Sequence, residues 1–355
     1  MALLPAPSPA HQPVRGAPQL GEGIAVTTRI GIIVGMEESF PQAFIAKVNE
    51  TPGFRADFIK LGGTRAHELA PDYSVIVDRL SHEVPYYRMH LKAAALAGTF
   101  VINDPFWWSS DDKFFGYSLA AKLGVAVPRT VMLPSRSYIP SIDPKRSLRN
   151  LTYPIDWQGI ADYVRFPAFL KPADGGGWKH VTRVENMDQL FAAYNASDTL
   201  VMTLQEGIEF EEYVRCICVG KNFILPIKYD PKRRRYIEAE GFMPKALENR
   251  VLDDAWAINQ SLGYDMNSVE FAVRDGVPYA IDFTNPAPDM DVNSILPKHF
   301  HMCVDAMAAF VIKAARDGRQ NDGGGTFRRW LATDKKARPA DVVAATGATG
   351  AGGKS

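Results

Sequence analysis

The stretch 269–291 carries two acidic side chains within apolar-rich runs and an amide side chain just after the second run. Two apolar-rich runs there flank an Asp-Gly pair at 275–276, which predicts a β-hairpin. Glu270 belongs to the first run and Asp282 to the second, and the strands of a hairpin bring such residues side by side. Asn285 follows the second run at a proline-rich exit. The stretch therefore offers a set of side-chain donors made only of oxygen atoms.

Such a donor set suits one kind of chemistry in particular. Mg²⁺ favours a few protein oxygens together with water and the phosphate oxygens of a substrate. The alternative is a hairpin whose acidic side chains are merely solvated on its outer face. The elements on either side of the hairpin bear on the choice between these two interpretations.

The composition indicates a globular protein without a strong electrostatic preference. The chain has 355 residues, with 40 basic and 40 acidic side chains, so nothing in its charge favours nucleic acid or a membrane. Its three cysteines are too few for a disulfide framework. Cys216 and Cys218 alternate on one face of a predicted strand and are expected to be buried in the protein core. Because no signal peptide and no membrane-spanning run is found, we expect a cytoplasmic protein.

The first third of the chain alternates short apolar runs with helical patterns. This alternation predicts a small doubly wound α/β domain. The absence of a G-x-G-x-x-G pattern gives little support to a dinucleotide site. Residues 1–27 are rich in Pro, Ala and Gly and predict a flexible leader. The strand-like runs are 29–36, 56–61, 73–78 and 99–103, and the helix-like runs are 41–49 and 90–97.

Two lysines lie at places where an element begins or ends. An Asp-Asp pair at 111–112 predicts a helix N-terminus with Lys113 in the first turn and Gly124 just past the end. Lys171 ends the apolar strand 166–172, and Gly175, Gly176 and Gly177 follow it. Consecutive glycines let backbone N–H groups approach phosphate oxygens closely, although a glycine run also serves as a plain flexible turn.

The remaining elements are predicted in the same way. Residues 134–157 lack periodicity and predict a long inserted loop. Arg215 projects opposite its apolar neighbours on a strand, and the basic run 232–235 predicts a solvated turn. Further strands are predicted at 130–133, 200–205, 214–219 and 223–229, and further helices at 186–194, 253–262 and 302–315.

In their order along the chain, these motifs resemble the ATP-grasp superfamily, in particular its glutathione synthetase-like, RimK-like and D-alanine–D-alanine ligase-like carboxylate–amine ligases. The resemblance covers residues 29–316. It is carried by Asp-Lys at 112–113 with L-G-V-x-V-P-R-T at 123–130, F-L-K-P at 169–172, Gln-Glu-x-Ile at 205–208, Arg215 followed by V-G-K, and the Glu270, Asp282 and Asn285 set.

The resemblance implies an α/β (α+β) architecture with an N-terminal pre-ATP-grasp domain and two α+β subdomains that bind ATP. The implied divisions are a leader at 1–27, the first domain at 28–107, a lobe carrying the lid loop at 108–206, a lobe carrying the metal site at 207–318 and a largely flexible tail at 319–355.

The resemblance also implies roles for the residues that bind nucleotide. Lys113 and Lys171 would hold the ATP phosphates as point charges. The loop of Gly175, Gly176 and Gly177 would close over the β- and γ-phosphates. Main-chain groups of the hinge, Gln205, Glu206 and Ile208, would bond the adenine edge. Either Glu211 or Glu212 would bond the ribose hydroxyls.

The implied chemistry lies around the hairpin. Glu270, Asp282 and Asn285 would ligate Mg²⁺, while Arg215 and Lys228 would face the transferred phosphate or the substrate acid. The acid-to-Asn spacing is one residue longer here than in the family, so either a bulge absorbs the extra residue or Asn285 is displaced.

The implied function is an ATP- and Mg²⁺-dependent ligase that joins a small-molecule carboxylate to an amine through an acyl phosphate. Asp289 and Asp291 either attract an ammonium substrate or are solvated loop acids. A small-molecule kinase and a non-catalytic nucleotide-binding protein remain the alternatives, and a homo-oligomer is left open.

Overall fold

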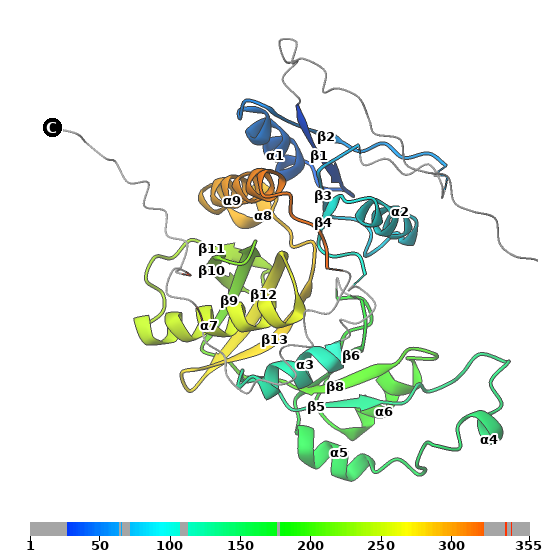
Figure 1. The fold of residues 1–355 in the computed structure, drawn as a ribbon. Coiled ribbons are helices and arrows are strands. Elements are labelled where there is room, and N and C mark those ends of the chain that lie inside the picture. Colours follow the sequence, from blue (N-terminus) through cyan, green and yellow to red (C-terminus); the bar gives the residue numbers. More distant parts are fainter. Residues whose placement is uncertain are drawn as a thin grey trace, which may run out of the picture.

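The computed structural model describes residues 27–63, 65, 72–106, 113–175, 178–322, 338 and 342. These residues form three β-sheets with helices packed against them (Figure 1). The arrangement confirms the predicted mixed α/β class. Within these ranges no helix is both long and apolar enough to cross a membrane. Nearly all of the predicted leader, residues 1–26, lies outside the described ranges.

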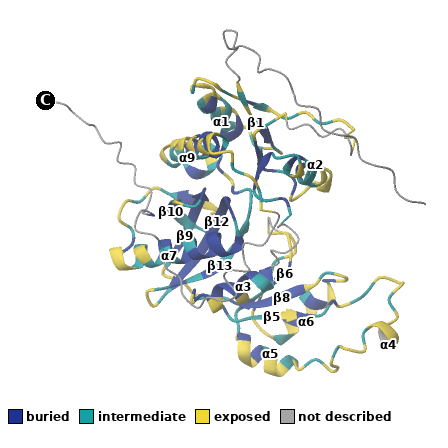
Figure 2. Cartoon of the chain, in the orientation of Figure 1, coloured by how far each residue is buried: buried dark blue, intermediate teal, exposed yellow. Residues whose placement is uncertain are grey.

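The first sheet is parallel and has helices on both faces, as predicted for a doubly wound domain. Its order is β2-β1-β3-β4. Helix α1 packs on one face and α2 on the other, so both faces of the strands are buried (Figure 2). The bounds are β1 (Thr28–Ile33), α1 (Ser39–Asn49), β2 (Phe54–Phe58), β3 (Val75–Asp78), α2 (Pro85–Leu96) and β4 (Phe100–Ile102).

The second sheet, formed by β5 to β8, is antiparallel and has its own hydrophobic core. We call it the lid sheet. Its order is β5-β8-β6-β7, and α5 and α6 pack on the same face as Leu170 and Leu204. Lys171 alternates with Leu170, so it points to the opposite face. The bounds are β5 (Thr130–Leu133), α4 (Pro144–Ser147), α5 (Trp157–Val164), β6 (Ala168–Pro172), β7 (Thr182–Val184), α6 (Met187–Asn195) and β8 (Met202–Glu206).

The third sheet, formed by β9 to β13, contains the predicted β-hairpin at one edge. We call it the hairpin sheet. Its order is β11-β10-β9-β12-β13, and all its pairs are antiparallel. Helices α3 and α7 cover one face, where Cys216 and Cys218 are buried as predicted. The bounds are α3 (Lys113–Lys122), β9 (Glu212–Val219), β10 (Phe223–Asp230), β11 (Arg235–Ile237), α7 (Lys245–Leu262), β12 (Met266–Arg274) and β13 (Val277–Asn285).

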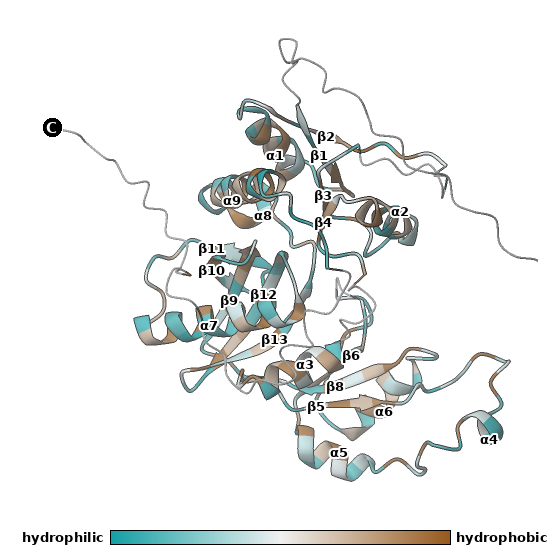
Figure 3. Ribbon diagram, viewed as in Figure 1, coloured by the Kyte–Doolittle hydropathy of each residue, from teal (hydrophilic) through white to brown (hydrophobic). Residues whose placement is uncertain are grey.

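One hydrophobic core joins the first sheet to the hairpin sheet. Helices α8 (Val292–Ile295) and α9 (Pro297–Arg316) lie between α1 and the second face of the hairpin sheet (Figure 1). Helix α9 turns its apolar stripe inward, with polar residues on its outer side (Figure 3). Ile32 of the first sheet and Ile217 of the hairpin sheet belong to this same core.

Polar side chains also tie the first sheet to the hairpin sheet. Arg79 is buried at the end of β3, donates to Glu37 over 2.6 Å and also donates to the carbonyl of Pro288. Asn103 exchanges hydrogen bonds with the main chain of Met266 at 2.7 and 2.8 Å. The domain boundaries drawn from the sequence remain predictions, but the first sheet and the hairpin sheet pack as one unit.

Asp291 has a structural role that neither interpretation of the sequence anticipated. Its Oδ1 accepts hydrogen bonds from the N–H groups of Ser39 and Phe40, at 3.0 and 3.1 Å, and from the Ser39 hydroxyl at 2.6 Å. These donors lie at the N-terminus of α1, 252 residues earlier for Ser39. Asp291 therefore supplies the cap that the residue preceding α1 does not provide.

We expect Asp291→Ala to lower the free energy of unfolding by about 1–2 kcal/mol at neutral pH, because the donors at the α1 N-terminus lose their acceptor. Asp291→Asn retains an acceptor and should keep most of the stability. Denaturant unfolding of the variants measures both effects, and an Ala variant as stable as the wild type would contradict the capping role.

The same cap has a pH dependence with a defined sign. Partial burial raises the pKa of Asp291, but the hydrogen bonds from Ser39 and Phe40 lower it below its ordinary value overall. A carboxylate with a lowered pKa stabilises the folded state above its unfolded pKa of about 3.9. The difference between wild type and Asp291→Ala should therefore shrink as the pH falls through the lowered pKa.

The predicted flexible tail is anchored at its described residues. Asn321 exchanges hydrogen bonds of 2.8 Å with the main chain of Val101 at the edge of the first sheet. Arg338 pairs with Asp253 of α7 over 2.6 Å, and Val342 is fully buried in the core beneath α7. These contacts concern the described positions alone, and the flexibility predicted for the rest of the tail stays a prediction.

Candidate active site

The hairpin places the two predicted carboxylates side by side. Glu270 on β12 lies opposite Asp282 on β13. The register shifts on both sides of this pair, and the shift toward Ser268 brings Asn285 opposite that serine. A bulge therefore absorbs the extra residue of the motif and returns Asn285 to the ladder. The Asn285 amide nitrogen donates to the Ser268 hydroxyl over 2.9 Å, which leaves the amide oxygen as the atom suited to a cation.

Each carboxylate faces a basic side chain of the protein. Arg215 on β9 pairs with Glu270, which also accepts from the hydroxyl of Tyr213. The Nζ of Lys113, on the first residue of α3, lies 3.3 and 3.4 Å from the two carboxylate oxygens of Asp282. Burial raises the pKa of Asp282, but the neighbouring lysines lower it overall, so this carboxylate is ionised at neutral pH.

These residues fit a Mg²⁺ ion bound together with phosphates. The donors are carboxylates and an amide oxygen, which are hard ligands. Among the described residues no group of three or more His, Cys, Asp and Glu side chains is placed to hold a metal ion. A metal held by Glu270, Asp282 and Asn285 would therefore need water and phosphate oxygens to complete its coordination, as Mg²⁺ commonly does.

Lys171 reaches across from the lid sheet to the hairpin sheet. Its Nζ donates to the Tyr117 hydroxyl at 2.7 Å, to Gln205 Oε1 at 2.8 Å and to the Ile281 carbonyl at 3.2 Å. The side chain is buried, and burial lowers the pKa of its ammonium group. Ile281 directly precedes Asp282, so the structure brings Lys171 to the same place as the predicted metal ligands.

Aromatic side chains surround Arg215, a feature that the sequence did not indicate. The guanidinium lies over the ring of Tyr229 at 4.1 Å and over that of Tyr236 at 5.8 Å. Burial lowers the pKa of Arg215, but Glu270 raises it overall. The register of β9, β10 and β12 puts Arg215 and Glu270 on one face of the sheet. In the sequence, Tyr and Arg at alternating positions of a strand are the signal that could have indicated this cluster.

The hinge between the lid sheet and the hairpin sheet is held by ion pairs. The carboxylate of Glu206, at the end of β8, pairs with Arg129 at 2.9 Å and with Arg274 of β12 at 3.1 Å. The next residue, Gly207, donates its N–H to the carbonyl of Pro167 over 2.8 Å. A Cβ at Gly207 would lie 2.7 Å from that oxygen, so the close approach requires glycine.

Three predicted residues lie away from Arg215. Lys228 pairs with Glu212 over 2.8 Å and lies opposite Val214 in the β9–β10 ladder. Lys228 therefore occupies the α7 face of the hairpin sheet, whereas Arg215 faces the other way. Glu211 is exposed, and its N–H donates to the main chain of β12. The structure thus pairs Glu212 with Lys228, and the roles expected of Lys228 toward the transferred phosphate or the acid and of Glu211 or Glu212 toward the ribose stay predictions.

The glycine loop is only partly described. Gly176 and Gly177 lie outside the described residues, while Gly175 has φ +81°, a conformation that favours glycine. Trp178, just past them, lies against Arg234 with the guanidinium 5.6 Å from the ring centre. Arg234 belongs to the predicted solvated turn 232–235, so that turn contacts Trp178, the residue that follows the glycines.

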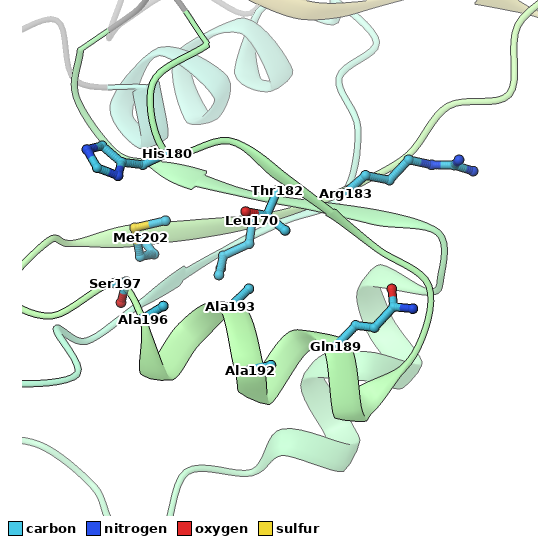
Figure 4. Close-up of a pocket in the computed structure, with 10 residues that line it drawn as sticks. All are labelled: Leu170, His180, Thr182, Arg183, Gln189, Ala192, Ala193, Ala196, Ser197 and Met202. Carbon is cyan, nitrogen blue, oxygen red and sulfur yellow. The ribbon is translucent and has the colours of Figure 1, made fainter.

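A pocket of about 360 Å³ lies behind the lid sheet, between α6 and strands β6 to β8 (Figure 4). Its wall includes Leu170, Met202 and the small residues Ala192, Ala193 and Ala196 of α6. Leu170 and Lys171 point to opposite faces of the sheet, so this pocket is separate from the lysine–carboxylate site.

The comparisons with known proteins identify the fold. No protein-family model matches the chain, and no curated protein sequence matches it either. Among solved structures, D-alanine–D-alanine ligase from Bacillus anthracis complexed with ATP is similar, with a TM-score of 0.54 and 20% identity over 82% of this chain and 97% of that one. A RimK domain ATP-grasp protein from Sphaerobacter thermophilus has a TM-score of 0.59 and 16% identity over 80% and 100%. The VanG D-Ala:D-Ser ligase from Enterococcus faecalis has a TM-score of 0.57 and 15% identity over 81% and 99%.

The chain therefore has the ATP-grasp fold, and the predicted resemblance to ATP-grasp ligases is confirmed for the fold. The matches span nearly the full length of each of these solved chains. At identities of 15 to 20% the likeness concerns architecture, so the reaction has to be argued from the side chains.

Proposed function

We propose that the protein is an ATP- and Mg²⁺-dependent ligase that joins a carboxylate to an amine and releases ADP and phosphate. The observation that carries this proposal is that Lys171 of the lid sheet contacts the main chain of β13 beside Asp282. Asp282 in turn is paired with Lys113 and lies opposite Glu270, which is paired with Arg215. Two of the three solved structures are named as ligases, and one of these two is complexed with ATP, which supports the same reaction class.

The site offers positioning and charge rather than a protein nucleophile. Lys113 and Lys171 would hold phosphate oxygens, and Glu270, Asp282 and Asn285 would hold Mg²⁺, which neutralises charge on the phosphates. Arg215 would orient the carboxylate substrate by paired hydrogen bonds. An oxygen of that carboxylate then attacks the γ-phosphorus, and the bond to the β-phosphate oxygen breaks to release ADP.

The second half of the reaction forms the amide. The amine nitrogen attacks the acyl carbon, phosphate leaves with the electron pair of the C–O bond, and the nitrogen loses its proton. Until the amine arrives, the acyl phosphate has to be kept from water. We expect the glycine loop to provide this shielding, and Trp178, which follows the loop, contacts Arg234 of the hairpin sheet.

The proposal is tested by screening pairs of acids and amines for ADP release. Hydroxylamine, a small and strong nucleophile, should trap the intermediate of an accepted acid as a hydroxamate. AMP and pyrophosphate would instead indicate an acyl adenylate and overturn the mechanism. ADP with a stable phosphorylated product that is indifferent to amines would place the protein among small-molecule kinases.

The hinge supports a preference for adenine. If the Glu206 carbonyl and the Ile208 N–H read the adenine edge, ATP should stabilise the protein more than GTP does. A ligand at 100 times its dissociation constant adds about 2.7 kcal/mol of stability, so the melting temperature should rise by several degrees with ATP. Thermal shift assays with both nucleotides measure this, and equal shifts would mean that the hinge is misplaced.

A further inference from the structure

The Tyr117 hydroxyl links the phosphate-binding lysine to the chain that carries the metal ligand. It accepts a hydrogen bond from Lys171 Nζ over 2.7 Å and donates one to the carbonyl of Ile281 over 2.7 Å. Tyr117 lies on α3, 164 residues before Ile281 in the chain. Only 4% of the residue is exposed, so water does not replace either bond readily.

The ring of Tyr117 is held independently of its hydroxyl. It packs edge to face on Phe283, with ring centres 5.2 Å apart, in the core between α3, α7 and β13. The preceding residue is Gly116, and a Cβ there would already lie 3.1 Å from the Phe283 ring. The close packing of α3 on β13 therefore fixes the position of the Tyr117 ring. Because the hydroxyl oxygen is bonded directly to that ring, its position is fixed as well.

The acceptors that Lys171 contacts are neutral. They are the Tyr117 hydroxyl, the side-chain carbonyl of Gln205 and the main-chain carbonyl of Ile281. Lys113 differs, because its ammonium is paired with Asp282. Neutral acceptors hold the Lys171 ammonium in place without neutralising its charge, so that charge remains for an anion such as a phosphate.

We propose that Tyr117 is a positioning residue that holds the Lys171 ammonium against Ile281 and away from Asp282. This inference rests on the proposed function. Without the hydroxyl, Lys171 loses an acceptor and turns toward the adjacent Asp282 carboxylate, which attracts it. The lysine would then compete with Mg²⁺ for Asp282, and Asp282 would partly neutralise the charge that Lys171 offers to the phosphates. Tyr117 thereby keeps the Lys171 ammonium, which would bind phosphate, apart from the Asp282 carboxylate, which would bind the metal.

The test is Tyr117→Phe in the full chain, with nucleotide affinities measured by calorimetry. We expect the dissociation constant of MgATP to rise about 10-fold, as for the loss of one hydrogen bond to a charged group. The dissociation constant of AMP, which lacks the β- and γ-phosphates, should change less than about 2-fold. Raising the Mg²⁺ concentration should recover part of the lost affinity for ATP.

The matched control is Tyr194→Phe on α6, which removes another buried hydroxyl, one that donates to the Pro134 carbonyl just after β5 over 2.8 Å. Its melting temperature should fall about as much as that of Tyr117→Phe, while its MgATP affinity stays at the wild-type value. Equal weakening of MgATP and AMP in Tyr117→Phe, or no weakening, would overturn the inference. A wild-type protein that does not bind ATP would overturn the proposed function as well, which is a separate result.

Discussion

Asp282→Asn is expected to remove Mg²⁺-dependent turnover while leaving the fold intact. The substitution keeps the size of the side chain but removes one charged oxygen ligand of the metal. The loss should exceed the roughly 10- to 100-fold that follows removal of an outer partner of a metal ligand. Turnover as a function of Mg²⁺ concentration measures the effect, and so does the Mg²⁺ dependence of ATP affinity.

The matched control is Asp275→Asn, which makes the same change of charge at the exposed tip of the same hairpin. Asp275 has φ +52°, a conformation that asparagine tolerates well, so the control should fold and turn over normally. Full activity of Asp282→Asn at limiting Mg²⁺ would remove Asp282 from the metal site. Loss of activity in both variants would indicate that general destabilisation, and not metal binding, is responsible.

Lys171→Ala is expected to abolish both ADP formation and hydroxamate formation, because both depend on the same phosphoryl transfer. Loss of one preorganised positive charge at the transferring phosphate should lower the rate by about 100- to 1000-fold. The variant also deprives the Tyr117 hydroxyl and the Gln205 side-chain carbonyl of the hydrogen bonds that Lys171 donates, so its melting temperature should fall.

Lys245→Ala serves as the control, because Lys245 is an exposed lysine at the start of α7, outside the site. It should retain both products. Hydroxamate formation that persists in Lys171→Ala without ADP release would separate the two steps and contradict the shared phosphoryl transfer. Persistence of both products would show that Lys171 does not act on the phosphates.

Strong local patterns were predicted well from the sequence. The hairpin of β12 and β13 forms because its strands are apolar and its Asp-Gly turn supplies the required backbone conformation, with φ +52° and +69°. The strands of the first sheet follow from short β-branched runs that are buried on both faces. Within the candidate site, Glu270 and Asp282 were predicted from the hairpin, whereas roles for Lys113 and Lys171 came from the resemblance to ATP-grasp ligases.

Weak or interrupted patterns were missed. Helix α5 follows the predicted inserted loop 134–157, and its eight residues are too few to show a clear period. Helix α7 begins at Lys245, eight residues before the predicted start, because its first two turns are polar on most sides. Strand β7 has three residues and forms only by pairing with β6.

The sequence alone predicted the long elements and the reactive side chains in or beside them, because those properties depend on neighbours along the chain. It could not determine which face Lys228 occupies, since an alternating strand specifies two faces but not its register against β9. Nor could it join Asp291 to α1 or Tyr117 to Lys171 and Ile281, contacts that depend on packing between distant segments. The tertiary structure decided these points, because burial in a shared core fixes how α3, the lid sheet and the hairpin sheet meet.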